Sequence, residues 1–511
     1  MSDVLNMPKN WVQVTIADLG KVVSGGTPST KEHSYWGGNI SWISPSDLTG
    51  YSSKHIVKGA KSITQEGLKN SSATIMPAGS IHFSSRAPIG YTVISSTDMT
   101  TNQGFKSLVP AQGIFNEYIY YYFKSAKQLA ESKATGTTFK EISGAAFSKL
   151  PVPLPPTNEQ HRIVAKIEEL FSELDKGIEN LKTARAQLKV YRQALLKHAF
   201  EGKLTAQWRA ENHDKLGTAD ALLKRIQHER TQRYQQQLAD WEAAGKPGSK
   251  PKAPKSLPPL TAEELAELPE LPEGWGWEKN ENYLFEIKDG THDTPKYVDT
   301  GIPFVTQKNI KDGKLSMGNV TYISTEDHEK FFKRSNVQKG DLIISMIGHG
   351  RGECCLVDVD TIFSIKNVGL FKFFSGLQSS RFLKFYFQST GGLNLALSKS
   401  KGGAQPFIGL TELRDWPVPV CSTEEQSEIA NQLDARLSVC DQLDQTISAS
   451  LQQAEALRQS ILKKAFSGRL VPQDPHDEPA SALLARIKAE RAIGAKNATI
   501  AAKPRNTAGR K

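Results

Sequence analysis

Two stretches of this chain repeat one another and decide how it folds. Residues 151–204 begin PVPLPPTNEQHRIVAKIEELF and end ALLKHAFEGKL, and residues 417–470 begin PVPVCSTEEQSEIANQLDARL and end SILKKAFSGRL. Each residue of the first copy has its counterpart 266 positions later, as Phe200 and Phe466 illustrate. Because neither copy has gained or lost a residue, the repeat indicates an element whose length matters.

Each stretch is predicted to form a long helix, over residues 158–199 in the first copy. Apolar residues recur at steps of three, four or seven among charged and amide side chains, a pattern typical of a helix packed along one seam. Thr157 with Gln160 predicts a capping box at the start, Gly202 predicts the stop, and the second copy repeats these signals. The seams are Ile163, Ile167, Leu170, Leu174, Ile178, Leu181, Leu188, Tyr191 and Leu195 in one copy, and Ile429, Leu433, Leu437, Cys440, Ile447, Leu451, Ala454, Leu457 and Ile461 in the other.

A helix of this length, about 60 Å at 1.5 Å per residue, needs a partner that buries its seam. The simplest partner is the other copy, packed antiparallel as a coiled coil, so that the flanking segments lie at opposite ends. The alternative is a pair of unrelated surface helices on separate domains.

The segments outside the helices also repeat, with less similarity. Leu271–Trp275 answers Met7–Trp11 and Gly290 answers Gly26, in both cases 264 positions later, whereas other matches drift from this offset. Short strand-like runs such as 40–44 alternate with Gly, Pro and Ser turns, and an aromatic-rich helical run follows. We therefore expect globular domains that have diverged in what they recognise, joined to helices that fix a distance.

The predicted fold class is α+β, with an internal pseudo-twofold repeat. Two globular domains with small mixed β-sheets are separated by the two long helices of the antiparallel coiled coil, since 511 residues exceed a single core. The predicted segments are a first globular domain (1–155), a first long helix (156–215), a helix with an extended Lys/Pro-rich linker (216–270), a second globular domain (271–420), a second long helix (421–475), and a short helix with a basic disordered tail (476–511).

Composition narrows the class of protein. A formal charge of +10 favours a polyanionic partner. Four cysteines, two of them adjacent at Cys354 and Cys355, suit neither a zinc site nor a disulfide framework. No signal peptide or membrane-spanning run is recognisable. We expect a soluble cytoplasmic protein.

Catalytic signatures are missing from the sequence. There is no Asn-Pro-Pro-aromatic or Asp-Pro-Pro-aromatic tetrapeptide to hold a target amine, and no G-x-x-x-x-G-K-[ST] phosphate loop. Glu286-Ile-Lys288 lacks the upstream Pro-Asp of a nuclease core, and Gly348–Gly352 is interpreted as a loop after a strand. The chain is therefore not expected to be an enzyme, and no metal or cofactor site is predicted in it.

What remains is DNA binding by polar loops, whose side chains suit phosphates and base edges. For any single candidate, a solvated polar loop residue is at least as good an interpretation as a contact with a base. Arg86 and Arg351 rank highest because an arginine after an apolar strand suits bidentate contacts, while Trp36, Trp42 and Trp275 are assigned to the core. The candidates are Thr27, Ser29, Lys31, Ser44, Arg86, Thr138 and Lys140 in the first domain, and His292, Lys296, Gln307, Lys308, Arg351, Lys366, Lys401 and Gln405 in the second.

Several motifs together resemble the specificity subunit of type I restriction-modification systems. They are SGGTPS, SSRAPIG and NQGF in the first domain, the helix starts with their EQ pair, the AFEGKLTAQWRAEN exit, and the ALLKRI and ALLARI segments. The resemblance implies two target-recognition domains that each read half of a bipartite duplex DNA site, a coiled coil that sets the spacer, and no catalysis. The second domain departs from the first, with GTHDTP and KNVG, so its half-site should differ.

The resemblance also implies partners. They are two modification subunits, which bind S-adenosylmethionine and methylate adenine at N6, and two restriction subunits, which use ATP and Mg²⁺ to translocate and cut DNA. No membrane is implied. The competing functions are a stand-alone DNA methyltransferase or nuclease with unrecognised motifs, and a coiled-coil scaffold without a DNA role.

Overall fold

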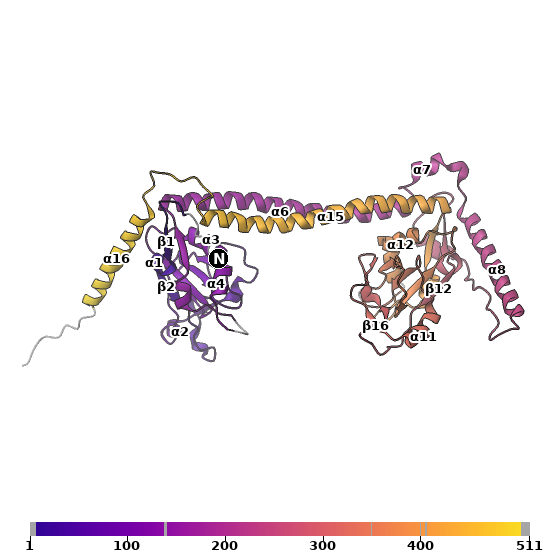
Figure 1. The fold of residues 1–511 in the computed structure, drawn as a ribbon, viewed down its shortest axis with the longest axis horizontal. Coiled ribbons are helices and arrows are strands. Elements are labelled where there is room, and N and C mark those ends of the chain that lie inside the picture. The colour runs from indigo at the N-terminus through magenta and orange to yellow at the C-terminus, as the bar shows by residue number, and fades with distance from the viewer. Residues whose placement is uncertain (1–6, 137–139, 349, 399, 404–405, 502–511) are drawn as a thin grey trace, which may run out of the picture. The chain divides into compact units, whose positions relative to one another are not determined.

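The computed structural model describes residues 7–136, 140–348, 350–398, 400–403 and 406–501 of the chain (Figure 1). The described residues form two compact units. The first takes in the chain up to Leu181 and again from Ser448 onward, and the second is Lys182–Ile447. Each unit therefore holds one globular domain, part of its own long helix and part of the other.

The first globular domain is built from three small sheets with helices packed against them. The five-stranded sheet has the order β2-β9-β6-β7-β4, the three-stranded sheet β5-β3-β8 contains a parallel pair, and β1 pairs with β10. Its elements are β1 (Val12–Thr15), α1 (Ile16–Leu19), β2 (Gly20–Ser24), β3 (Trp36–Ile43), β4 (His55–Ile56), β5 (Lys61–Ile63), α2 (Gln65–Lys69), β6 (Ile81–Ser84), β7 (Thr92–Ser95), β8 (Thr100–Thr101), β9 (Phe105–Pro110), α3 (Asn116–Ser125), α4 (Lys127–Ser132), α5 (Gly144–Ser148) and β10 (Pro151–Leu154).

The second globular domain repeats this plan. Its sheets have the orders β12-β20-β17-β18, β16-β13-β19 and β11-β21, with β14 and β15 as an added hairpin. Its elements are β11 (Gly276–Lys279), α10 (Asn280–Tyr283), β12 (Glu286–Asp289), β13 (Ile302–Val305), β14 (Ile310–Lys311), β15 (Lys314–Leu315), β16 (Thr321–Ile323), α11 (Thr325–Ser335), β17 (Leu342–Ser345), β18 (Cys354–Leu356), β19 (Ser364–Ile365), β20 (Val368–Lys372), α12 (Ser380–Gln388), α13 (Thr390–Ser398), α14 (Leu410–Asp415) and β21 (Pro417–Val420).

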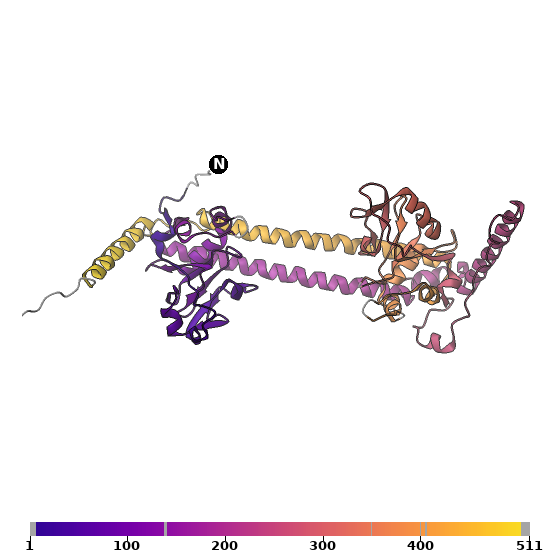
Figure 2. The ribbon, with the colours of Figure 1, turned by 90° about the horizontal axis from the view of Figure 1, so that it is seen from below.

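The two long helices are α6 (Thr157–Phe200) and α15 (Thr423–Phe466), 44 residues each. Within each unit they lie side by side (Figures 1 and 2). Asp175 pairs with Arg458 in the first unit, and Arg192 pairs with Asp441 in the second, so the pairing is antiparallel as predicted. The predicted seam is wrong at Tyr191 and Leu457, which are both 50% exposed.

The helices begin where the repeat predicts, but not through capping boxes. The Gln160 amide donates to the Pro155 carbonyl (3.1 Å), and its oxygen accepts from the backbone N–H of Phe115 (2.8 Å). Gln426 makes the same two contacts, with Cys421 (2.9 Å) and Ser379 (3.0 Å). Each glutamine is completely buried. It therefore joins its long helix to the globular domain, a role that a local capping signal does not reveal.

The glutamate before each glutamine binds the tryptophan at the start of the same domain. Trp11 Nε1 donates to Glu159 (2.9 Å), and Trp275 Nε1 donates to Glu425 (2.9 Å). Glu425 also accepts from Arg209. Trp11 is buried. Of the tryptophans assigned to the core, Trp42 is buried, whereas Trp36 and Trp275 are only half-buried. The EQ pair of the repeat thus fixes both the first strand and the helix of each domain.

The ends of the long helices pack against the globular domain of the other repeat. The Phe466 ring packs edge-on against Tyr118 and Tyr122 of α3, and the Phe200 ring packs edge-on against Phe382 and Tyr386 of α12. Because the two helices are antiparallel, the exit of one meets the domain that precedes the other. Each unit is thereby closed by a segment from the other copy of the repeat.

The remaining helices are α7 (Ala206–Glu211), α8 (Ala219–Ala243), α9 (Ala262–Ala266) and α16 (Ala480–Ala501). The first residues of α8 and α16 dock in the same way: the N–H of Ala219 donates to Gly274, and that of Ala480 donates to Asn10. Arg230 binds the Glu281 and Leu284 carbonyls at α10, and Arg491 binds the Ala17 carbonyl in α1. The helices that contain the ALLKRI and ALLARI segments thus bind equivalent positions on the two domains.

Two segments differ from expectation. The 246–259 run forms no helix or strand, and it is docked on the second domain, where Leu257 and Asn282 exchange hydrogen bonds of 2.8 and 3.0 Å. α16 continues to Ala501, and so takes in part of the tail that was predicted to be disordered within 476–511. Several alanines after Arg491 favour this extension.

Candidate nucleic-acid interface

Loops from separate parts of the first domain meet in one cluster. The N–H groups of Gly25 and Gly26 donate to the Phe105 and Thr101 carbonyls (3.2 and 2.8 Å), which brings the loop after β2 against the loop before β9. A Cβ at Gly25 would lie 1.8 Å from the Asn102 carbonyl oxygen, so only glycine permits this approach. The Thr27 hydroxyl, in the same loop, donates to Gln103.

Arg86 belongs to this loop cluster and lies opposite an acidic residue that sequence reasoning missed. Its guanidinium is 3.5 Å from the Glu141 carboxylate, and the two side chains are 36% and 37% exposed. The Lys106 ammonium group is also 3.5 Å from Glu141, and it donates to the Gln103 carbonyl (3.2 Å). The cluster therefore combines a partly exposed arginine and a buried lysine with one partly exposed carboxylate acceptor.

The equivalent loops of the second domain also meet. The N–H of Gly290 donates to Val368 (2.9 Å), and Thr291 exchanges backbone contacts with Ile365 and Asn367. One ring nitrogen of His292 is 2.9 Å from the Asn367 side-chain oxygen, and the other is 3.0 Å from the Asp289 carboxylate. Asp289 in turn accepts hydrogen bonds of 2.8–3.0 Å from Arg334, a residue missed from sequence.

Other predicted residues of the second domain lie around this cluster. Gln307 lies beside Gly348, and Lys366 donates to Thr294 (2.5 Å). Arg351 donates to the Ser400 hydroxyl (3.1 Å) and to the Gly348 carbonyl (3.1 Å), so its loop is held by its own side chain. The segment from Gly348 to Gly352 connects β17 and β18 as the predicted loop, with His349 outside the described residues.

The rest of the candidates fall into three groups. Ser29, Lys31, Lys140 and Lys296 are exposed loop residues, and Lys308 is exposed in a short 3-10 helix, Gln307–Asn309. Ser44 donates to Asp47 (2.8 Å) in a capping box, and Lys401 pairs with Glu412, whose pKa this hydrogen bond lowers. Thr138 and Gln405 lie outside the described residues. DNA contact by any of these residues stays a prediction.

Two further residues of the clusters that were not predicted, Gln103 and Asn367, could have been found from the sequence. NQGF and KNVG stand at matching places before β9 and β20, and Gln103 and Asn367 within them contact the predicted Thr27 and His292. Glu141 and Arg334 had no such signal. They are distant in sequence from the loops that they contact, so only the fold brings them there.

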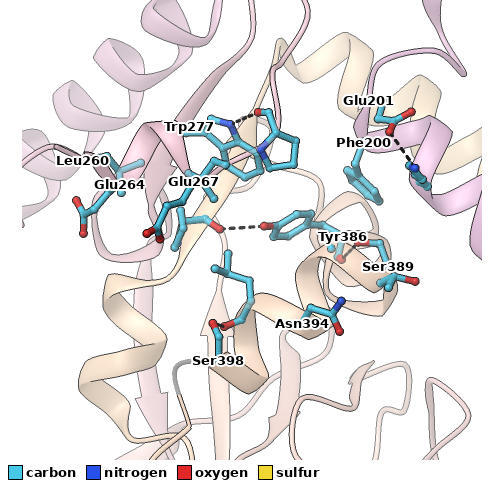
Figure 3. A pocket seen from close by; sticks show the side chains of 17 residues that line it. Phe200, Glu201, Leu260, Glu264, Glu267, Trp277, Tyr386, Ser389, Asn394 and Ser398 are labelled. Atoms are coloured by element: carbon cyan, nitrogen blue, oxygen red, sulfur yellow. Dashed lines mark hydrogen bonds and ion pairs between the residues drawn. The ribbon is translucent and has the colours of Figure 1, made fainter. Parts of the chain in front are cut away.

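A separate cavity of about 590 Å³ lies elsewhere in the second unit (Figure 3). Trp277, Tyr386 and Phe200 contribute rings to its lining, and Glu264 and Glu267 of the α9 region lie along one side (Figure 3). None of its lining residues belongs to the loop cluster. The cavity is therefore distinct from the candidate interface.

In the part of the chain that the structure describes, no group of three or more His, Cys, Asp or Glu side chains is placed to hold a metal ion. No described helix is long and apolar enough to cross a membrane.

The chain matches one known family twice. The model of the family described as "Type I restriction modification DNA specificity domain" matches residues 8–183 and again residues 272–453. The two matches begin at the first strand region of each globular domain and run into the long helix that follows. The repeat in the sequence is thus a repeat of one family domain.

Individual relatives are named as specificity subunits of type I restriction enzymes. The chain is 39% identical over 201 residues to the MjaIX specificity subunit of Methanocaldococcus jannaschii, a match that covers 39% of this chain and 46% of that protein. It is 24% identical over 427 residues to the EcoBI specificity subunit of Escherichia coli, covering 80% of this chain and 79% of the relative.

A solved structure shares the fold. It is described as "Structural basis underlying complex assembly and conformational transition of the type I R-M system", and it superposes with a TM-score of 0.63 at 18% identity. The superposition covers 91% of this chain and 99% of the other. The α+β domains, the long helix pair and the internal repeat predicted from sequence are confirmed.

Proposed function

Because the chain belongs to the type I restriction modification DNA specificity domain family, with one match in each repeat, we propose that it is the DNA-recognition subunit of a type I restriction-modification enzyme. Each globular domain reads one half of a bipartite target in duplex DNA. The paired α6 and α15 set the spacer between the half-sites. The chain selects the site, and partner subunits carry out the chemistry.

One observation carries this proposal. The same loop cluster is built twice on the same sheet plan, but from different side chains: Thr27, Gln103 and Arg86 in one domain, and His292 and Asn367 in the other. A shared scaffold with divergent polar loops suits two different readings of DNA, because phosphate contacts position a protein whereas base contacts specify the site. The overall positive charge supports the same partner.

A domain exchange tests the reading of half-sites. Residues 1–155 are replaced by the first domain of another family member, and the chimera is expressed with the modification subunits. Sequencing of N6-methyladenine positions should show one half-site changed and the other retained. Both half-sites changing, or neither, would contradict the proposal. A scaffold without a DNA role would give no sequence-specific binding in a gel shift of the assembled complex.

The partners belong to the same proposal. Two modification subunits bind S-adenosylmethionine and methylate adenine at N6, and two restriction subunits use ATP and Mg²⁺. The equivalent docking of α8 and α16, with Arg230 and Arg491 in matching roles, supports two copies of one partner on a pseudo-twofold chain. Native mass spectrometry should find two modification subunits per chain at saturation, and a plateau at one would contradict this stoichiometry.

A further inference from the structure

The two domains place different chemistry at one equivalent position of the loop cluster. In the first domain, Glu141 exchanges backbone hydrogen bonds of 2.9 and 3.0 Å with Thr135, and the next N–H, that of Ile142, donates to Ser85 (3.0 Å). In the second domain, Phe407 exchanges two such bonds of 2.8 Å with Lys401, and the N–H of Ile408 donates to Met346 (2.8 Å). Phe407 is therefore the structural counterpart of Glu141.

The neighbour across each bridge is replaced as well. Glu141 forms an isolated antiparallel bridge with Arg86, and Phe407 forms one with Ile347. The counterpart of Arg86 is thus Ile347 and not Arg351, the arginine that sequence reasoning had ranked with it. A charged pair in the first domain, Arg86 with Glu141, has become an apolar pair in the second, Ile347 with Phe407.

Three of these four side chains are exposed to solvent, and the fourth, Ile347, is partly buried against the core of the second unit. The Arg86 and Glu141 side chains are 36% and 37% exposed, and Phe407 is 43% exposed. An exposed phenylalanine on a loop full of polar groups contributes little to the core, since exposed apolar area gives no burial energy. The position is therefore available to a partner in both domains.

A carboxylate at this place must avoid the phosphates of DNA. Glu141 meets this condition because Arg86 and Lys106 both lie 3.5 Å from its oxygens and offset its charge. The Ser85 hydroxyl is also 3.5 Å away. The carboxylate is thus held as an acceptor next to an arginine donor, the combination that matches cytosine N4 and guanine O6 and N7 in the major groove.

We infer that Arg86 and Glu141 read a G·C base pair in one half-site, and that Ile347 and Phe407 read the thymine methyl group of an A·T pair at the equivalent place in the other. This inference rests on the proposed function and adds to it the class of base pair read at one position of each half. Apolar side chains recognise the thymine methyl group because it is the one apolar group on the major-groove edge of the bases.

Base analogues test the inference on the wild-type complex. The target is first defined by sequencing N6-methyladenine in the host genome, and the complex of this chain with its modification subunits is then bound to duplexes carrying single analogues. Uracil in place of one thymine of the second half-site should raise Kd about threefold to fourfold, the effect of one methyl group. 7-Deazaguanine in place of one guanine of the first half-site should raise Kd about 5- to 150-fold.

Variants assign these effects to the residues. Phe407→Ala should make the complex insensitive to the uracil exchange, and Arg86→Ala should make it insensitive to 7-deazaguanine. Glu141→Gln should relax the preference at the same base pair as Arg86→Ala. Lys31→Ala is the matched control, because an exposed lysine that meets phosphate should weaken binding equally on all of these duplexes. Phe407→Leu keeps an apolar side chain and should retain part of the uracil effect.

The outcomes separate the inference from the proposed function. If the wild-type complex has a bipartite target but tolerates uracil at every thymine of the second half-site, or 7-deazaguanine at every guanine of the first, the inference is wrong and the proposed function stands. The inference is equally wrong if the variants keep the wild-type sensitivity to the analogues. If the wild-type complex shows no sequence preference at all, the proposed function fails first.

Discussion

His82 is completely buried in β6, the central strand of the five-stranded sheet. Its Nδ1 is 2.9 Å from the Ser107 hydroxyl, and its Nε2 is buried without a hydrogen-bond partner among the described residues. Burial lowers its pKa from 6.5 to about 3, because desolvation disfavours the charged ring. The first domain therefore carries a neutral histidine at its centre at physiological pH.

This residue makes the stability of the first unit depend on pH. Between pH 6.5 and about 3, the unfolded chain binds a proton at His82 that the folded chain does not. The free energy of unfolding is therefore not reduced by His82 above pH 6.5, and it decreases as the pH falls through this range. From pH 7 to pH 5 the free energy of unfolding should drop by about 2 kcal/mol more than in His82→Gln. Denaturant unfolding at several pH values measures the difference, with His33→Gln, an exposed histidine, as control. Parallel curves for wild type and His82→Gln would contradict the prediction.

Individual site residues were predictable only in part. Thr27, Arg86 and His292 were accessible from sequence because they stand in loops that directly follow strands. Glu141 and Phe407 were not, because their equivalence depends on the bridges to Thr135 and Lys401 and leaves no shared sequence motif. A pair that changes from charged to apolar is visible only when the two domains are compared as structures.

At the scale of elements, the glycine after each long helix permits a close contact. Gly468 has a φ of +70°, and a Cβ there would lie 2.3 Å from the ring of Pro8; Gly202 has the same relation to Pro272, at 2.1 Å. The Pro-x-x-Trp segment at the start of each domain thus covers the end of the helix from the other repeat.

Replacing two glycines by alanine should distinguish the close contact at Gly468 from the ordinary helix propensity of glycine. Gly468→Ala should destabilise the first unit by about 1 to 2 kcal/mol from the left-handed backbone alone, with more from the clash with Pro8. Gly177→Ala, inside α6 with open space around it, should instead stabilise by about 0.5 to 1 kcal/mol. Thermal unfolding of the two variants compares them directly. Equal shifts in the same direction would show that the contact with Pro8 does not matter.

The long helices were the most predictable elements. The bounds of α6, Thr157–Phe200, lie within one residue of the predicted 158–199, and α15, Thr423–Phe466, has the same length, because an ungapped repeat with prolines before and glycine after leaves little freedom. The sheet order was not predictable, since strands as short as His55–Ile56 carry no periodic signal. The contacts of Gln160 and Gln426 were also missed, because both reach residues distant in sequence.

At the scale of the whole molecule, the proposed function makes the length of α6 and α15 a measure of the DNA spacer. Four residues inserted after Ala184 and four after Ser450 add about one turn, 5.4 Å, to each helix. A base pair rises about 3.4 Å, so methylome sequencing should find the spacer longer by one or two base pairs, with both half-sites unchanged.

A matched insertion controls for disturbance of the chain. Four residues added after Ser249, in the exposed part of the linker, should leave the spacer unchanged. If the lengthened helices still direct methylation only to the original spacing at full activity, they do not measure distance. A complex that is inactive on every spacing reports damaged packing, which thermal unfolding of the same variant detects.

The segments of the chain that make up each unit also bear on the order in which the two units fold during synthesis. The second unit is one continuous segment, Lys182–Ile447, whereas the core of the first includes Phe466, Leu483 and Ile487 from the far end of the chain. Domains usually fold as they leave the ribosome, N-terminal first. Here we expect the order to be reversed: the first domain to be translated is completed only when Phe466 covers Tyr118 and Tyr122 of α3, after the second unit has been translated in full.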